Sequence, residues 1–114
     1  MSVKLTTRQV GDVTVVDAVG RITLGDGAST FRDTVRDLAA GGKKKLLLNL
    51  AEVSYIDSSG IGEMVSGFTT VSNQGGQVKL LNPTKRVKDL LQITKLYTVF
   101  EVFDDEASAV RSFT

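Results

Sequence analysis

The sequence contains no cysteine, no histidine and no tryptophan, and it has a single proline. Without cysteine there is no disulfide framework, no thiolate metal site and no cysteine nucleophile. Without histidine there is no Ser-His-Asp triad and no histidine zinc site. Much of the catalytic and metal-binding chemistry open to a short chain is therefore excluded. We expect a protein that is not an enzyme and that holds no metal or cofactor of its own.

The sequence also has little net charge and no long apolar run. The formal net charge of +1 is too small to steer the chain onto nucleic acid or an anionic membrane. No stretch approaches the roughly 18 to 20 apolar residues of a membrane span. Residues 1–10 carry Lys4 and Arg8 and lack the apolar core of a signal peptide. We therefore expect a cytoplasmic protein that binds neither nucleic acid nor membranes directly.

The length and the order of the local patterns predict one α/β domain over residues 1–114. With 41% apolar and 24% charged residues, the composition is that of a globular chain. Alternating and helical hydrophobic patterns predict a mixed sheet, with an antiparallel N-terminal hairpin, parallel βαβ units and helices packed on the sheet. Glycine-rich residues 20–27 are expected as a connection with room for a short strand at 21–24. The expected elements are strands at 3–8 and 13–19, a helix from 28 to Gly41-Gly42, a strand at 46–50, a helix at 58–73, a strand at 77–81, a helix around 87–91, a strand at 99–103 and a short helix within 104–113.

One motif lies where ligand sites in open α/β sheets tend to occur, after a buried strand and at the start of a helix. It reads Tyr55-Ile56-Asp57-Ser58-Ser59-Gly60-Ile61-Gly62. One interpretation of its polar residues is a plain helix N-cap. Gly60 and Gly62 cost roughly 1 kcal/mol each relative to Ala within a helix, so a close approach of another backbone is one explanation for them. Tyr55 and Tyr97 are expected to be packing residues with a solvated hydroxyl.

The helix that follows is unusually poor in charge. Residues 58–78 carry one formal charge, Glu63, where average composition would place about five. Small uncharged residues on an exposed helix face allow a partner to approach closely, and interface cores are depleted of charge in the same way. The alternative is a helix that is simply buried by the first and third helices. The positions expected to face outward are Gly62, Ser66, Gly67, Thr69, Thr70 and Asn73.

With these features the chain resembles a STAS domain, and more narrowly a bacterial anti-sigma factor antagonist. The resemblance covers the opening hairpin, the Gly20 region, the strand at 46–50 and the segment 53–62. That segment carries the family signature D-S-[ST]-G-[LI]-G without a substitution. Asn82-Pro83 before the third helix also fits the family pattern.

The resemblance implies a partner switch centred on residues 57–60. In such proteins the serine after the aspartate, here Ser58, is phosphorylated by the anti-sigma factor, a serine kinase that supplies the ATP and Mg²⁺ chemistry. The unphosphorylated antagonist binds the anti-sigma factor and releases the sigma factor, and a PP2C-type phosphatase reverses the modification. Asp57 is expected to cap the helix and orient the loop, and Ser59 to be a second capping residue. Modification of Ser59 is the alternative.

The loop before the first helix departs from the family pattern. Many antagonists have an acidic residue where this chain has Thr23, and Asp26 follows three residues later. The residues expected to contact a partner are Gly62, Glu63, Ser66, Gly67, Thr70, Thr23 and Asp26. Two other functions stay open: a non-switching STAS scaffold subunit of a transporter or signalling complex, and a sensor of a small ligand or nucleotide. The oligomeric state is expected to be a monomer or a weak dimer.

Overall fold

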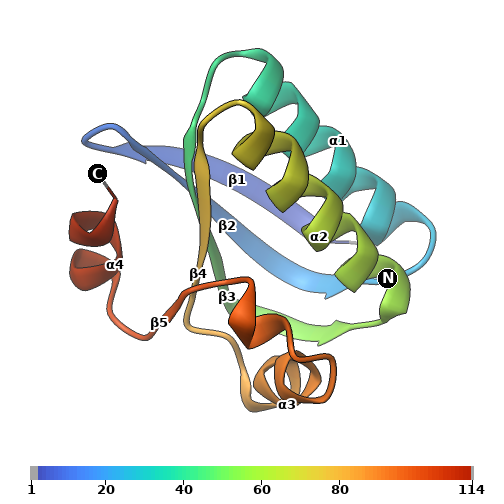
Figure 1. Ribbon diagram of the computed structural model, residues 1–114. Helices are drawn as coiled ribbons and strands as arrows, with labels where there is room; N and C mark the ends of the chain where they lie inside the picture. The colour runs from blue at the N-terminus through green and yellow to red at the C-terminus, as the bar shows by residue number, and fades with distance from the viewer. Residues whose placement is uncertain (1–2, 114) are drawn as a thin grey trace.

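The computed structural model describes residues 3–113, so residues 1–2 and 114 of the expected domain lie outside it. A five-stranded sheet has the strand order β1-β2-β3-β4-β5. β1 and β2 form the antiparallel hairpin, and the other neighbours pair in parallel, which confirms the predicted mixed α/β sheet (Figure 1). The strands are β1 (Val3–Val10), β2 (Val13–Ile22), β3 (Lys45–Ile56), β4 (Gln77–Leu81) and β5 (Val102–Phe103). The helices are α1 (Asp26–Ala40), α2 (Ser58–Asn73), α3 (Lys85–Ile93), the 3₁₀ turn η1 (Leu96–Thr98) and α4 (Glu106–Ser112).

The two faces of the sheet are covered unequally. α1, α2 and α3 pack on one face over the larger core, whose members include Val16, Leu48 and Met64. α4 lies alone on the opposite face, where Ala109 and Phe113 close a smaller core (Figure 1). The alternation along each strand divides the side chains between these cores. The larger core supports the ends of the strands that carry the motif.

Three strands run further than the sequence patterns predicted, and the first of them, β1, ends at Val10 instead of residue 8. β2 continues through Gly20 to Ile22, so the separate short strand expected at 21–24 is wrong. β3 extends beyond the predicted 46–50 to Ile56, because parallel pairing continues to the Ile22–Ile56 register position. Both isoleucines are fully buried there. This extension carries β3 directly into the motif that begins at Asp57.

Two other boundaries differ from the predictions, at α1 and at the last strand, whereas the short helix predicted within 104–113 is confirmed as α4. α1 begins at Asp26 rather than near residue 28, and the Ala28 N–H donates to the Thr23 carbonyl. The last strand is confined to β5, because the turn that contains η1 continues to Phe100, with the Val99 and Phe100 N–H groups donating to the Leu96 carbonyl. α4 begins at Glu106, since the Asp105 carboxylate accepts the Ser108 N–H at 2.9 Å as the helix N-cap. These ends depend on capping and pairing, which hydrophobic periodicity does not report.

Polar contacts attach α4 to the sheet. The Arg8 guanidinium bridges Asp17 of β2 and Glu106 of α4, at 2.7 Å and 2.6 Å. This cation lowers the pKa of the Glu106 carboxyl. On the same face, the buried Lys79 ammonium donates to the carbonyl and the hydroxyl of Ser112 at 3.0 Å and 2.9 Å. Among residues 3–113, no helix has the length and apolar character needed to cross a membrane.

Candidate functional site

The Asp57 carboxylate joins two segments that are far apart in the sequence. One oxygen accepts the Gly60 N–H at 2.9 Å and caps α2, as expected for this residue. The other accepts the Leu24 N–H at 2.9 Å, which fixes the loop between β2 and α1. Hydrogen bonds from the Leu24 and Gly60 amides lower the pKa of Asp57, because they stabilise the ionised carboxylate. The loop and the first turn of α2 are therefore held as one unit.

Gly60 allows this unit to pack closely. A Cβ placed on Gly60 would lie 2.1 Å from the Ile22 carbonyl oxygen and 2.8 Å from Cγ2 of Ile56. The close backbone approach expected from the two glycines is thus confirmed at Gly60. It is wrong at Gly62, where a Cβ would meet no atom within 4 Å. Only the first of the two glycines is required by the packing of the loop against α2.

The two serines of the motif are placed differently. Ser58 is the first residue of α2 and is exposed, whereas Ser59 is half-buried. Within residues 3–113 neither hydroxyl makes a hydrogen bond, so the expected capping role of Ser59 is wrong and Asp57 alone provides the side-chain cap. The Ser58 hydroxyl therefore projects from the first turn of a helix, where free N–H groups and the helix dipole favour an added anion.

An uncharged exposed strip runs along α2 from this serine. Gly62, Ser66, Thr69 and Asn73 are exposed, and their spacing places them on one side of the helix. We call these four residues the α2 strip. Its exposure does not fit the alternative in which the first and third helices bury this side of α2. Thr70 is half-buried beside it.

Two residues expected on this surface face α1 instead. A Cβ placed on Gly67 would lie 3.0 Å from Cγ1 of Val35, so the half-buried Gly67 packs against α1. The half-buried Glu63 forms an ion pair with Arg32 of α1 at 3.8 Å. The outward-facing prediction is thus wrong for Gly67 and is corrected by the contact between the two helices.

The loop before α1 presents an exposed apolar residue that no sequence motif indicates. Leu24 is 80% exposed, although its N–H is fixed by Asp57. Thr23 is half-buried and Asp26 is an exposed residue of the first turn of α1. Within the described chain, neither the Thr23 nor the Asp26 side chain makes a hydrogen bond or ion pair with residues 57–60. The only sequence signal for Leu24 was a large apolar residue next to glycine in a loop.

The Asp57 carboxylate is expected to make stability depend on pH. In Asp57→Asn the amide oxygen can accept one of the two backbone N–H groups, so the variant should unfold at lower urea at neutral pH. Because the pKa of Asp57 is lowered in the folded state, its contribution is present above the ordinary value of 3.8 and is lost as the pH falls through the lower folded value. Urea midpoints of the two proteins should therefore converge on acidification.

Asp26→Asn is the matched control, because the exposed Asp26 side chain makes no hydrogen bond or ion pair within residues 3–113. Its midpoint should stay close to that of the unmodified protein at every pH, because an exposed charge in the first turn of a helix contributes only about 0.3–1 kcal/mol. The urea midpoints of Asp57→Asn and the unmodified protein could instead differ by the same amount at every pH. That result would show that the ionised carboxylate does not hold the loop in place.

Sequence and structure comparisons define the family. The family profile of the STAS domain matches residues 4–109. The anti-sigma-B factor antagonist of Bacillus subtilis is 32% identical over 102 residues, which cover 90% of this chain and 92% of that protein. A match to a candidate anti-sigma factor antagonist of Thermotoga neapolitana, at 36% identity, spans 60% of this chain and 61% of that protein. The chain belongs to the STAS-domain family, and named relatives within it are anti-sigma factor antagonists.

Solved structures agree with this assignment. The crystal structure of a candidate anti-sigma factor antagonist from Thermotoga maritima superposes with a TM-score of 0.90 at 25% identity, over 96% of this chain and 93% of that one. The phosphorylated form of the Bacillus cell fate determinant SpoIIAA has the same fold, with a TM-score of 0.74 at 19% identity over 95% of this chain and 97% of that one.

Proposed function

We propose that this protein is an anti-sigma factor antagonist that is switched by phosphorylation of Ser58. In its unphosphorylated form it binds an anti-sigma factor with serine-kinase activity and thereby releases the sigma factor. The observation that carries the proposal is the exposed, unbonded Ser58 hydroxyl at the first position of α2, next to the uncharged α2 strip. The similar protein SpoIIAA has a phosphorylated form, which also supports the proposal.

The position of Ser58 makes a local electrostatic switch sufficient. Phosphorylation adds about −1.5 to −2 charges at neutral pH. In the free protein, the N-terminus of α2 and the surrounding water stabilise this charge, so the fold need not change. In the complex the same charge would be desolvated against a surface that fits a neutral serine and an uncharged helix strip. Binding therefore weakens while the protein stays folded.

The geometry also favours Ser58 over Ser59 as the modified residue. A kinase must reach the hydroxyl with its own nucleotide and metal, and Ser58 is exposed whereas Ser59 is half-buried in the first turn. The Asp57 side chain is already committed to two backbone N–H groups, so it positions the loop instead of acting as a base. The chemistry of transfer, with ATP and Mg²⁺, belongs to the kinase, and removal of the phosphate belongs to a PP2C-type phosphatase.

A capture experiment tests the proposal. The unmodified chain and Ser58→Asp are each immobilised and exposed to native cytosol, and the retained proteins are identified by mass spectrometry. The unmodified chain should retain a protein with a histidine-kinase-like ATPase domain, and Ser58→Asp should not. Equal retention of one partner by both chains would contradict the switch and indicate a constitutive scaffold. Retention of no specific partner would contradict binding itself, and stabilisation by a nucleotide alone would then favour a sensor.

A further inference from the structure

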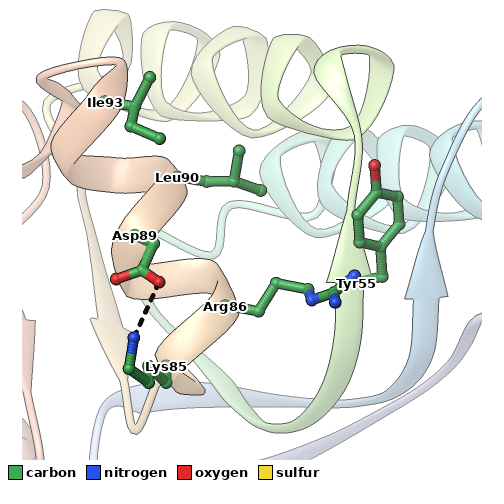
Figure 2. Close-up of a pocket in the computed structure, with 6 residues that line it drawn as sticks. All are labelled: Tyr55, Lys85, Arg86, Asp89, Leu90 and Ile93. Carbon is green, nitrogen blue, oxygen red and sulfur yellow. Dashed lines mark hydrogen bonds and ion pairs between the residues drawn. The ribbon is translucent and has the colours of Figure 1, made fainter.

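A tyrosine ring close to residues 57–60, which we call the switch loop, lies near the guanidinium groups of two arginines. Arg21 Cζ lies 5.7 Å from the centroid of the Tyr55 ring, and Arg86 Cζ lies 5.3 Å from it. Arg21 of β2 is the register partner of Tyr55 in β3, and Arg86 reaches the ring from the first turn of α3 (Figure 2). Tyr55 precedes Ser58 by three residues, so this cluster and the switch loop lie at the same edge of the sheet.

The fold holds Arg86 in this position. The Thr84 hydroxyl donates to the Val53 carbonyl of β3 at 3.2 Å and accepts the Val87 N–H as the N-cap of α3. Val87 and Leu91 are buried in the larger core on the inner side of the same helix. Arg86 therefore projects from a fixed helix start toward Tyr55, and it is exposed, so its donors are accessible to a partner.

The two guanidinium groups have no anionic partner. Within residues 3–113 neither Arg21 nor Arg86 forms an ion pair or a hydrogen bond, and ring stacking is their only specific contact. The neighbouring Lys85 differs, because its ammonium is paired with Asp89 at 3.2 Å (Figure 2). Stacked guanidinium groups keep their hydrogen-bond donors free for a carboxylate. Two such groups at one ring therefore present unsatisfied donors to an incoming anion.

An apolar surface continues from the cluster. Tyr55 and α3 line an open groove of about 500 Å³, with Leu90 and the 77% exposed Ile93 along the helix beyond Arg86 (Figure 2). A pair of cations beside an apolar surface is suited to a protein segment that carries both an acidic and an apolar side chain. Two cations at one point are too few for the extended phosphate contacts of nucleic acid.

We propose that an acidic segment of the anti-sigma factor binds here, with its carboxylates on the free guanidinium donors of Arg21 and Arg86 and an apolar side chain against Leu90 and Ile93. This proposal rests on the proposed function and extends its interface from the switch loop across Tyr55 to α3. Arginine and tyrosine are enriched among the residues that dominate interface energies, especially where several meet at one point.

The test uses the anti-sigma factor retained by the unmodified chain. Its affinity is measured by titration calorimetry for Arg21→Gln, Arg86→Gln and the double variant, at low and at raised NaCl. Lys88→Gln is the matched control on the same helix, because Lys88 is exposed and is not among the residues that line this groove. We expect about tenfold weaker binding for each arginine variant, a flatter salt dependence for the double variant, and less than a twofold change for the control. Thermal melting of each free variant verifies that the fold is kept.

The outcomes separate this proposal from the one it rests on. If Ser58→Asp loses the partner while the arginine variants bind with unchanged affinity and salt dependence, the acidic-segment proposal alone is overturned. Equal weakening by Lys88→Gln would also overturn it, because it would indicate a general charge effect. If the unmodified chain retains no partner, the proposed function fails and this extension fails with it.

Discussion

Ser58→Asp is expected to weaken binding of the anti-sigma factor by 10- to 100-fold, roughly 1.4 to 2.8 kcal/mol of binding free energy. The substitution places a negative charge at the exposed first position of α2. In the free protein this charge is favoured by the helix N-terminus, so the thermal midpoint should stay within a few degrees of the original. In the complex the charge must lose its water against a partner that fits a neutral surface.

Ser58→Asn is the matched control for this prediction. Asparagine has the same shape as aspartate but carries no charge, and the exposed first position of α2 has room for either side chain. The asparagine variant should therefore keep most of the affinity, as measured by titration calorimetry. If the two variants bound equally well, or lost affinity equally, the negative charge would not be the cause and the switch would have to depend on shape.

Gly60→Ala is expected to have the largest effect on folding. The added Cβ would lie 2.1 Å from the Ile22 carbonyl oxygen, an atom of a central strand that cannot move without disturbing the β2–β3 pairing. Overpacking commonly costs 1–3 kcal/mol, and because backbone must shift here we expect a loss of about 3 kcal/mol or more. A domain of this size has only about 5–15 kcal/mol of stability, so urea unfolding should show the change plainly.

Gly62→Ala provides the comparison two residues later in the same helix. No atom lies within 4 Å of a Cβ at this position, so alanine fits and its higher helix propensity should raise the stability by about 0.5 kcal/mol. Gly60→Ala should lower the stability and Gly62→Ala should raise it, so the pair separates the effect of packing from that of helix propensity. A Gly60→Ala protein that unfolded at the same urea concentration as the unmodified chain would contradict the close contact between α2 and the Ile22 carbonyl.

The sequence predicted the fold where hydrophobic periodicity determines it. The apolar run at Leu46–Leu50 identified the central strand, and the spacing from Ile61 to Val71 identified the buried side of α2. Element ends were less accurate, because β3 continues to Ile56 through pairing with β2 and not through its own hydrophobic pattern. The residue pattern of one strand does not indicate how far a neighbouring strand will pair with it.

The candidate site was predictable in its motif and not in its tertiary contacts. The cap by Asp57 and the close approach at Gly60 followed from residue types at the start of a helix. The bond from the Leu24 N–H to Asp57 joins residues that are 33 positions apart, and no local rule predicts it. Gly67 was expected on the outer side of α2, but a small residue can equally mark a helix–helix contact, as it does against Val35.

The most direct test of the switch is the site of phosphorylation itself. The unmodified chain is incubated with the captured anti-sigma factor and Mg²⁺-ATP, and the product is examined by intact mass and by fragmentation of its peptides. The account predicts the addition of one phosphate, located on Ser58, and no addition to Ser58→Ala. A phosphate on Ser59 or elsewhere, or no phosphate on a chain that binds this kinase, would contradict it.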